Sequence, residues 1–531
     1  MLRAAIVTLS IHMVGCAAGA DAGERDERVV TIIATAEAKG TPEPCGCNSD
    51  PLGDVARVVT LAKGGLLVDA GGLLYDRESA APEKRAQADA KARLLAKVYS
   101  RGEVGLGADD LVHGAKVVAP PRQAANCAGV ARAEPRVHVV DGVKVGVFGV
   151  VAPSQVADAK LSAGAPEAAA RAAVERLRRE GAQVIVALFG MTRAEARGVM
   201  TAVEGISFGV IGADVGEGMA EAEPVGAGFL VAPADLLRRA ARLELHVRGG
   251  KVALAPFEGK AQCDLRCQRL ARKIADLDAQ LAGWKNDPSA DRAFVAARQK
   301  ERDDLAAEKH RLETTPPAPP ATSYFTYALT DVRTKIPRDP AVEKQLKQLA
   351  RAIGAANLAA ARGSKPPPAD PGQPHYVGRA ACEKCHKPAV EFWQHTVHAQ
   401  AWKTLADADK QYDYDCIGCH VTGFQRAGGS GLATVEKQRL VDVQCEVCHG
   451  PASKHVAEAG LEEPKSLTLK PADRFCADNC HTREHSDTFQ LQAYLRDVVG
   501  KGHGEKLRAA LGDGATGHEL RTKALAAARA R

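Results

Sequence analysis

The sequence predicts a multidomain protein, with an α/β domain in its N-terminal half, a helical hairpin inserted into that domain and a mainly α-helical C-terminal domain. Three observations predict this organisation. From Val29 onward, short apolar runs alternate with stretches of helical periodicity. Residues 259–313 carry a charged helical seam, and a Cys-x-x-Cys-His pattern recurs in the C-terminal third. A chain of 531 residues is long enough for about two or three domains.

The N-terminal half predicts strands that alternate with helices. Its apolar runs fall at residues 29–34, 66–68, 137–140, 143–151, 184–188 and 209–212. Residues 167–179 lie between two of these runs and have helical periodicity. Such alternation is typical of a sheet covered by helices, and we expect this domain at residues 29–258.

Five sequence words in this half resemble the calcineurin-like metallophosphoesterases, in their 5'-nucleotidase branch. VDGVKVGVFGVVAP, GAQVIVALFG and GISFGVIGAD follow one another in the order seen in that family, and ATAEAKGTPEPCGC and LLVDAGGLLY resemble its first two metal motifs. The resemblance covers about residues 29–255. It implies a layered sheet sandwich, with two metal ions held by Asp, His and Asn around a bridging hydroxide.

The metal ligands that this resemblance implies are replaced in the present chain. The corresponding positions carry Glu37, Lys39, Gly72, Ala108, Asp109, Phe189, Ala213 and Val215. Gly, Ala, Phe and Val offer no ligating side chain, and the ammonium of Lys39 repels a cation. We therefore expect a degenerate domain that keeps the fold and has no phosphoesterase activity.

Residues 259–313 predict an antiparallel helical hairpin inserted between two strands. Leu270, Ile274, Leu277 and Leu281 form a seam spaced by four, three and four residues, residues 284–288 interrupt it, and a second charged helix runs to about Glu313. The hairpin is either a spacer or a surface for a dimer or another partner. Residues 314–362 then predict a proline spacer, a return strand and a helix, and residues 363–373 a proline-rich linker.

Three Cys-x-x-Cys-His motifs follow: Cys382-Cys385-His386, Cys416-Cys419-His420 and Cys445-Cys448-His449. This pattern is typical of haem c, whose vinyl groups bind the two thiols while the histidine binds the iron. Zinc sites pair two Cys-x-x-Cys half-sites or add a distant histidine arm, and they do not need a histidine after every second cysteine. A fourth motif, Cys476-Cys480-His481, has one extra residue and predicts a fourth haem in a wider loop.

The words around these motifs resemble the tetrahaem cytochrome c554 family. They are YVGRAACEKCH, WQHTVHAQAW, CIGCHVTGF, VQCEVCHGPASKH and CHTREHSDTF. We expect the domain at residues 374–505, where little continuous apolar sequence is present and haem would supply the core, and a charged tail at 506–531. The resemblance implies four packed haems that transfer electrons between a donor and an acceptor protein. The chain departs from the family in its fourth motif and in GPASKH, where the family more often has a second Gly.

Each haem iron has a sixth coordination position. A second histidine there suits outer-sphere electron transfer, whereas an open position permits ligand binding or catalysis. Seven histidines outside the motifs are available: His375, His395, His398, His455, His485, His503 and His518. By resemblance, His398 and His455 are the best distal ligands and His503 is the third. One haem in the family resembled is five-coordinate, which leaves room for an open iron here that the sequence does not assign to a motif.

Residues 1–16 resemble a lipoprotein signal, because a short apolar run ends in Met13-Val14-Gly15-Cys16. A lipidated Cys16 and a tether at 17–28 predict export and a lipid anchor on a bacterial membrane. Of the fourteen cysteines, those outside the motifs and the signal are Cys45, Cys47, Cys127, Cys263 and Cys267. Disulfides are expected among these five in an oxidising compartment.

The net charge of +6 is too mild to favour nucleic acid as a partner. From the haem motifs and the signal-like residues 1–16, we expect an exported multihaem electron carrier. The alternative is a haem enzyme that acts on a small nitrogen or sulfur species at an open iron. A surviving phosphohydrolase is a weaker alternative.

Overall fold

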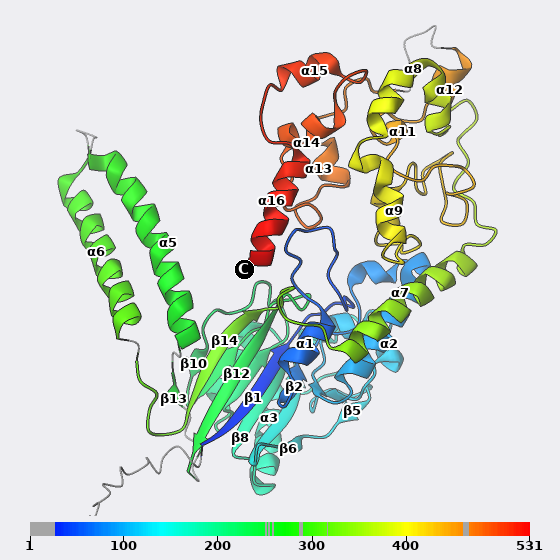
Figure 1. The fold of residues 1–531 in the computed structure, drawn as a ribbon. Coiled ribbons are helices and arrows are strands. Elements are labelled where there is room, and N and C mark those ends of the chain that lie inside the picture. The colour runs from blue at the N-terminus through cyan, green and yellow to red at the C-terminus, as the bar shows by residue number, and fades with distance from the viewer. Residues whose placement is uncertain are drawn as a thin grey trace, which may run out of the picture. The chain divides into compact units, whose positions relative to one another are not determined.

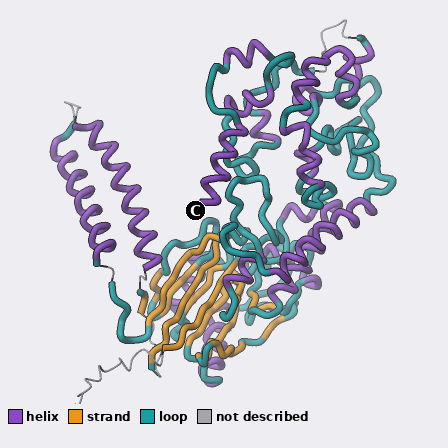
Figure 2. Tube along the Cα trace, viewed as in Figure 1, coloured by secondary structure: helices purple, strands orange, loops and turns teal. Residues whose placement is uncertain are grey.

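The computed structural model describes residues 27–530 except 250–251, 253–254, 258–259, 286–289, 316 and 460–466 (Figures 1 and 2). The predicted signal, with Cys16, and nearly all of the predicted tether lie outside the described residues. The chain divides into two compact units. One contains the residues up to Val30 together with Glu244–Thr326, and the other contains Thr31–Leu243 together with the residues from Tyr327 onward.

Two six-stranded sheets form the N-terminal part, as the predicted α/β class requires. The first sheet has the order β13-β14-β12-β1-β2-β3, and the second has the order β10-β11-β9-β8-β7-β6. The first comprises β1 (Glu27–Thr35), β2 (Leu66–Asp69), β3 (Glu103–Val104), β12 (Arg239–Arg248), β13 (Ala255–Pro256) and β14 (Tyr324–Asp331). The second comprises β6 (Arg136–Val140), β7 (Val143–Val151), β8 (Val184–Gly190), β9 (Phe208–Ile211), β10 (Glu223–Val225) and β11 (Gly228–Val231). A small third sheet pairs β4 (Arg122–Gln123) with β5 (Arg132–Ala133).

The centre of the second sheet consists of parallel strands that are almost entirely apolar. β8 is buried at every residue, and it pairs in parallel with β7, with Val147 opposite Val186. Parallel neighbours need crossover connections, which α3 (Pro166–Arg179) and α4 (Arg193–Ala202) supply. Strands covered on both faces carry continuous apolar runs, which is why these segments could be recognised from the sequence.

Close backbone contacts bring the carboxyl ends of the two sheets together. A Cβ atom added at Gly212, after β9, would lie 2.2 Å from the carbonyl oxygen of Ala70, after β2. One added at Gly190 would lie 1.9 Å from the carbonyl oxygen of Leu106, after β3. Any larger residue at either glycine would push the strand ends apart, so these glycines fix the edge at which the two sheets meet.

A buried carboxyl group braces the same edge. Asp69, at the end of β2, is fully buried and accepts hydrogen bonds from the Thr35 hydroxyl at 2.7 Å and the Gly71 amide at 3.0 Å. Burial raises the pKa of Asp69 to about 7, and the neighbouring Asp110 adds to the rise, although the two hydrogen bonds oppose it. Desolvation therefore outweighs hydrogen bonding at this carboxyl.

Helices α1 (Val55–Leu61), α2 (Arg85–Tyr99) and α7 (Pro340–Ala360) pack on the first sheet. Their apolar faces share one core with β1 and β2, to which Leu95, Tyr99 and Leu346 contribute. Asp339 begins α7 by accepting hydrogen bonds from two backbone amides of its first turn. The C-terminal residues of α7 lead into the linker toward the motif-rich domain.

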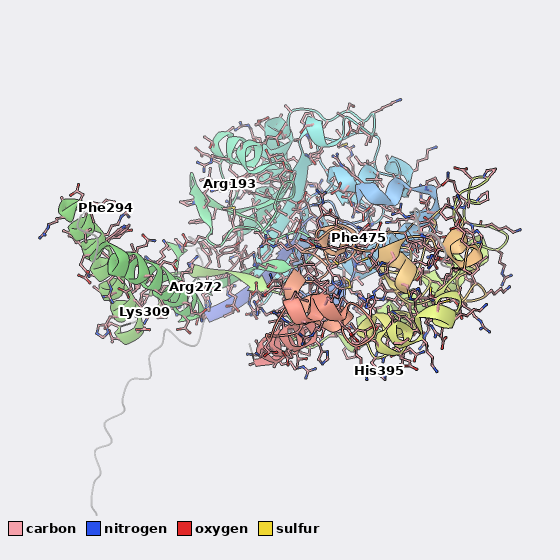
Figure 3. All side chains as sticks on the ribbon, turned by 90° about the horizontal axis from the view of Figure 1, so that it is seen from above. Arg193, Arg272, Phe294, Lys309, His395 and Phe475 are labelled. Carbon is pink, nitrogen blue, oxygen red and sulfur yellow. A yellow bond between two sulfur atoms is a disulfide. The ribbon has the colours of Figure 1, made fainter. Side chains whose placement is uncertain are left out.

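The predicted helical hairpin is present in the unit that contains Glu244–Thr326. It lies between β13 and β14, which pair in parallel. It consists of α5 (Lys260–Lys285) and α6 (Arg292–Thr314), which pack through Cys263, Cys267, Leu270 and Leu312. Charged side chains such as Arg272 and Lys309 lie along it (Figure 3). The disulfide expectation holds only in part, because Cys45 bonds to Cys47 whereas Cys127 and Cys267 form no disulfide.

The C-terminal domain is built of short helices joined by long loops. They are α8 (Arg379–Trp393), α9 (Ala401–Ala406), α10 (Ile417–His420), α11 (Cys445–His449), α12 (Ser453–Ala457), α13 (Phe475–Asn479), α14 (Leu491–Val498), α15 (Glu505–Ala510) and α16 (Gly517–Ala530). The sequence predicts only a charged tail at residues 506–531. In the structure, α16 lies within this range and packs on α14. In the described part of the chain, no helix has both the length and the apolar character that crossing a membrane requires.

This domain also corrects the expectation that haem alone supplies its core. Ile417, Val421, Val435 and Leu440 form a small buried cluster with Ala361 from the end of α7. Aromatic residues that are dispersed along the sequence complete the cluster, so no continuous apolar run predicts it.

Replacing Asp69 by Asn should make the stability of the protein less dependent on pH. In the wild type, the unfolded carboxyl ionises above about pH 4 while the folded one stays protonated to about pH 7, so stability falls as the pH rises through this range. The difference in the free energy of unfolding between Asp69→Asn and the wild type should therefore be roughly 1–3 kcal/mol more favourable to the variant at pH 8 than at pH 4. Thermal unfolding by circular dichroism measures this, with exposed Asp158→Asn as the control. A gain that is equal at both pH values would contradict the assignment.

Candidate metal centre in the C-terminal domain

Every Cys-x-x-Cys-His motif forms a single helical turn. The first lies on α8, where His386 leaves helical geometry, and the second and third form α10 and α11. In the fourth, the backbone amide of His481 donates to the carbonyl of Cys476 at 2.8 Å, so the wider motif still closes a turn. One turn brings both sulfur atoms and the following imidazole to the same side of the backbone, as attachment to a single porphyrin requires.

All four motifs line one cavity of about 2910 Å³. Sites for a single small molecule reach only about 1,000 Å³, so this cavity has room for several large cofactors. Its walls come from all parts of the C-terminal domain, including α14 and α16, and from residues 41–52 of the α/β part. A shared cavity places the four motifs in one cluster rather than at separate sites.

Three of the four motif histidines face a second histidine across the cavity. The ring centres are 6.2 Å apart for His386 and His455, 6.2 Å for His398 and His481, and 6.1 Å for His449 and His503. Two imidazoles bound to opposite faces of one iron hold their ring centres roughly 6.3 Å apart, because each metal–nitrogen bond is about 2.0 Å and each nitrogen lies about 1.15 Å from its ring centre. The residues present therefore fit bis-histidine haem at three positions.

Hydrogen bonds at Nδ1 orient several of these rings. His449 donates to the carbonyl of Thr468 at 2.7 Å, and His503 donates to that of Val498 at 2.8 Å. A proton held at Nδ1 leaves Nε2 free to bind a metal, and such partners fix the plane of the ring. In His455, by contrast, Nδ1 is buried without a hydrogen-bond partner among the described residues. A ring nitrogen in that condition is suited to a metal bond.

His420 differs from the other motif histidines. Its Nδ1 donates to the carbonyl of Ala401 at 2.7 Å, which orients the ring like the others. Across the residues that the structure describes, however, no histidine ring faces it at the spacing found in the three pairs. Among the described residues, His420 is therefore the motif histidine without a second histidine ring at this spacing.

The predicted distal ligand His398 lies deep in the cavity. Burial, together with the charges of His481 and His420, lowers its pKa to about 4. The neutral imidazole is the form that binds metal ions, so this environment favours ligation over protonation.

The motifs also lie side by side in two pairs. Cys382, in the first motif, lies close enough to Cys445 in the third to lower the pKa of the Cys445 thiol to about 7. The same relation joins Cys419 of the second motif to Cys480 of the fourth. The groups attached to the first and third motifs are therefore neighbours, as are those attached to the second and fourth.

Glu446, between the cysteines of the third motif, holds the start of the first. Its buried carboxylate accepts hydrogen bonds from the backbone amides of Val377 at 3.0 Å, Gly378 at 2.7 Å and Ala452 at 2.8 Å. Neighbouring Gln444 accepts one from the amide of Arg379 at 2.6 Å. These contacts lock the first and third motifs into one rigid body.

The substituted phosphoesterase positions also meet in space, at the carboxyl edge of the sheets. Lys39 lies 3.6 Å from Glu37 and 3.5 Å from Asp235, and the carboxylate of Glu37 accepts hydrogen bonds from the amides of Asp214 and Val215. A Cβ atom at Gly72 would lie 3.1 Å from the Cα of Glu37. Among the described residues, no group of three or more His, Cys, Asp and Glu side chains is arranged to hold a metal ion by itself. An ammonium group and its ion pairs therefore occupy this position.

Asp109 lies in the same cluster. Burial raises its pKa to about 6, with Glu37 adding to the rise and Lys39 opposing it. Phe189 and Ala213 are buried apolar residues here, and they contribute packing only.

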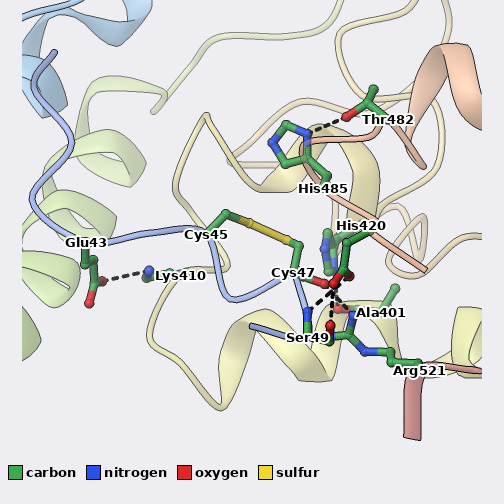
Figure 4. Close-up of a disulfide and its surroundings, with 11 residues drawn as sticks. Glu43, Cys45, Cys47, Ser49, Ala401, Lys410, His420, Thr482, His485 and Arg521 are labelled. Atoms are coloured by element: carbon green, nitrogen blue, oxygen red, sulfur yellow. Dashed lines mark hydrogen bonds and ion pairs between the residues drawn. A yellow bond between two sulfur atoms is a disulfide. The ribbon is translucent and has the colours of Figure 1, made fainter. Parts of the chain in front are cut away.

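Residues 41–52 were not recognised from the sequence as part of the cavity. Glu43 forms an ion pair with Lys410 at 2.7 Å, the amide of Ser49 donates to Asp487 at 3.1 Å, and Arg521 donates to the carbonyl of Cys47 (Figure 4). Single polar residues with distant partners leave no periodic signal. Only the unusual Cys45-Gly46-Cys47 spacing could have drawn attention to this loop.

Residues 381–450 match the family model of cytochrome c554 and c-prime. Cytochrome c-554 of Nitrosomonas europaea is 38% identical over 91 residues, which cover 14% of this chain and 38% of that protein. The predicted resemblance of this region is confirmed, and the cytochrome domain carries covalently bound haem c. The chain spans well under half the length of this relative.

Solved structures similar to the chain include phosphoesterases of the kind that the N-terminal words resemble. The 5'-nucleotidase precursor from Thermus thermophilus has 16% identity and a TM-score of 0.40, and the match covers 66% of this chain and 63% of that chain. The calcineurin-like phosphoesterase YfkN from Bacillus subtilis has 18% identity and a TM-score of 0.33, with 42% and 86% covered.

Replacing Glu446 by Ala should loosen the cytochrome domain. The change leaves three backbone amides without their acceptor, at a cost of about 1–3 kcal/mol for each one that stays buried. We expect a lower melting temperature and a changed Soret dichroism, with the haem content unaltered because the thioethers remain. Glu383→Ala, an exposed residue between the cysteines of the first motif, is the matched control and should behave as the wild type.

Proposed function

We propose that this protein is an exported tetrahaem c-type cytochrome that relays electrons between two redox proteins. The observation that carries the proposal is the set of three histidine pairs, 6.1–6.2 Å apart, in a cavity lined by all four motifs. When bound, haem iron supplies a one-electron ferric–ferrous couple.

The residues of the chain take defined roles in this proposal. The cysteine pairs of the four motifs hold the porphyrins, and His386, His420, His449 and His481 bind iron on the proximal side. His455, His503 and His398 are the distal partners of His386, His449 and His481 respectively. Rigid rings held on both sides of an iron change little between its oxidation states, which favours rapid electron transfer.

A haem enzyme is the second candidate, and His420 is the observation that favours it. With no histidine facing it, its iron has a coordination position for a small nitrogen or sulfur species. Electrons from the neighbouring fourth motif would reach that iron through the contact between Cys419 and Cys480.

The α/β domain serves in this proposal as a scaffold that supplies one wall of the haem cavity. Its former metal position holds Lys39 in place of a ligand, so hydrolysis of phosphate esters is not among its functions. Export is supported by the lipobox-like residues 13–16 and by the disulfide between Cys45 and Cys47, which is typical of an oxidising compartment. Lipidation of Cys16 would attach the cytochrome to the membrane.

Binding of carbon monoxide to the ferrous protein tests the assignment of the irons. Wild-type protein with four haems should bind one equivalent, at the His420 iron, and its ferric spectrum should contain one high-spin centre. His503→Ala should raise the stoichiometry to two, because the His449 iron loses its distal ligand.

Exposed His395 lies in the same domain and provides the control (Figure 3). His395→Ala should still bind a single equivalent. A wild-type protein whose ferric haems are all low-spin and bind no carbon monoxide would contradict an open iron at His420, and an unchanged stoichiometry in His503→Ala would contradict the His449–His503 pair.

Assays with nucleotide and aryl phosphates, with manganese added, should detect no turnover by the purified protein. Lys39→His with Gly72→Asp should not restore activity by itself, because Phe189, Ala213 and Val215 still offer no ligands. Turnover by the wild type that depends on manganese would show that the domain has kept its chemistry.

A further inference from the structure

The Cys45–Cys47 disulfide faces the haem cavity. Both cysteines and the intervening Gly46 line the same cavity as Cys416, Cys419 and His420 of the second motif. Figure 4 shows His420 and His485 in the surroundings of the disulfide. A sulfur pair contributed by the α/β domain therefore lines the same cavity as the motif histidine that no second histidine faces.

Contacts on both sides of the pair hold it against the cytochrome domain. Glu43 binds Lys410 before it, Ser49 binds Asp487 through both its amide and its hydroxyl after it, and Arg521 of α16 donates to the carbonyl of Cys47 itself. The loop is thus fastened at the cavity wall by ion pairs and hydrogen bonds that do not involve the sulfur atoms. Its position does not depend on the disulfide.

A purely structural staple explains this disulfide poorly. The stabilisation that a disulfide provides grows with the length of the loop it closes, and this one encloses a single residue. The pair is also accessible, since Cys45 and Cys47 are half-buried and Gly46 is exposed. Cys127, in contrast, is buried in an apolar cluster, as inert thiols usually are.

Arg521 places a guanidinium group at the backbone of Cys47. A nearby cation stabilises a thiolate, which is the nucleophile in thiol–disulfide exchange. Arg521 is therefore a positively charged partner of the loop at Cys47 itself.

We propose that Cys45 and Cys47 form a two-electron thiol–disulfide centre that accepts electrons from an external dithiol and passes them to the haem cluster. The dithiol attacks the disulfide, forms a mixed disulfide and leaves as its own disulfide, so that both cysteines become thiols. Reoxidation re-forms the Cys45–Cys47 bond, releases two protons to solvent and delivers two electrons, one to each of two ferric haems. This proposal rests on the electron relay proposed above.

The experiment compares the matured wild type with the Cys45→Ser/Cys47→Ser double variant. Haem reduction is followed by visible absorption after anaerobic mixing with dithiothreitol, which is a small dithiol. The wild type should be reduced at least about tenfold faster than the double variant, because only the wild type has an exchangeable disulfide. Equal rates would overturn the proposal.

Gly46→Ala is the matched control variant. A Cβ at this position would meet no atom within 4 Å, so the variant keeps both sulfur atoms without steric strain. It should retain the dithiothreitol rate of the wild type. Dithionite, which reduces haem directly, should reduce all three proteins at the same rate.

A second measurement reads the sulfur atoms directly. Wild-type protein is poised electrochemically with its haems ferrous or ferric, alkylated with iodoacetamide and analysed by mass spectrometry. Cys45 and Cys47 should be alkylated in the ferrous sample and protected in the ferric one, and protection in both would overturn the proposal. Haems that dithionite fails to reduce would overturn the relay itself, whereas equal dithiothreitol rates would overturn only the role of the cysteine pair.

Discussion

In the function that we propose, coordination of iron by two imidazoles is the constraint on which the cytochrome domain depends. A short helical turn can present two thiols and one histidine, but the second histidine must come from elsewhere in the chain and arrive within a few tenths of an ångström. His386 and His455 meet this condition at a ring separation of 6.2 Å. The loops and short helices of the domain serve to place such rings, while its own apolar cluster stays small.

The α/β domain illustrates the opposite situation, in which a scaffold persists after its chemistry has changed. The strand ends still converge, because Gly190 and Gly212 permit the close approach of the two sheets. At the point of convergence, Lys39 forms ion pairs with Glu37 and Asp235. Residues 41–52 follow the same edge, and they line the cavity that the four motifs share.

Much of this organisation could be predicted from the sequence. The continuous apolar runs of β7 and β8 indicate buried parallel strands, and the motif words identify the haem positions. The sequence did not reveal which distal histidine belongs to which motif, because that depends on how long loops fold back. Nor did it reveal the bonds of His449 and His503 to backbone carbonyls, since a carbonyl is present at every residue. The hydrogen bond from Arg521 to Cys47 could not be predicted either, because the sequence of α16 predicts only a charged tail.

The carboxylate of Glu446 has a consequence for the order in which the chain is assembled during biosynthesis. The amides of Val377 and Gly378 receive their acceptor from a residue that the ribosome adds much later. The segment that opens the first motif must therefore wait for the third before it can settle. Until the third motif has folded against it, the flank of the first motif lacks the acceptor that holds it in place.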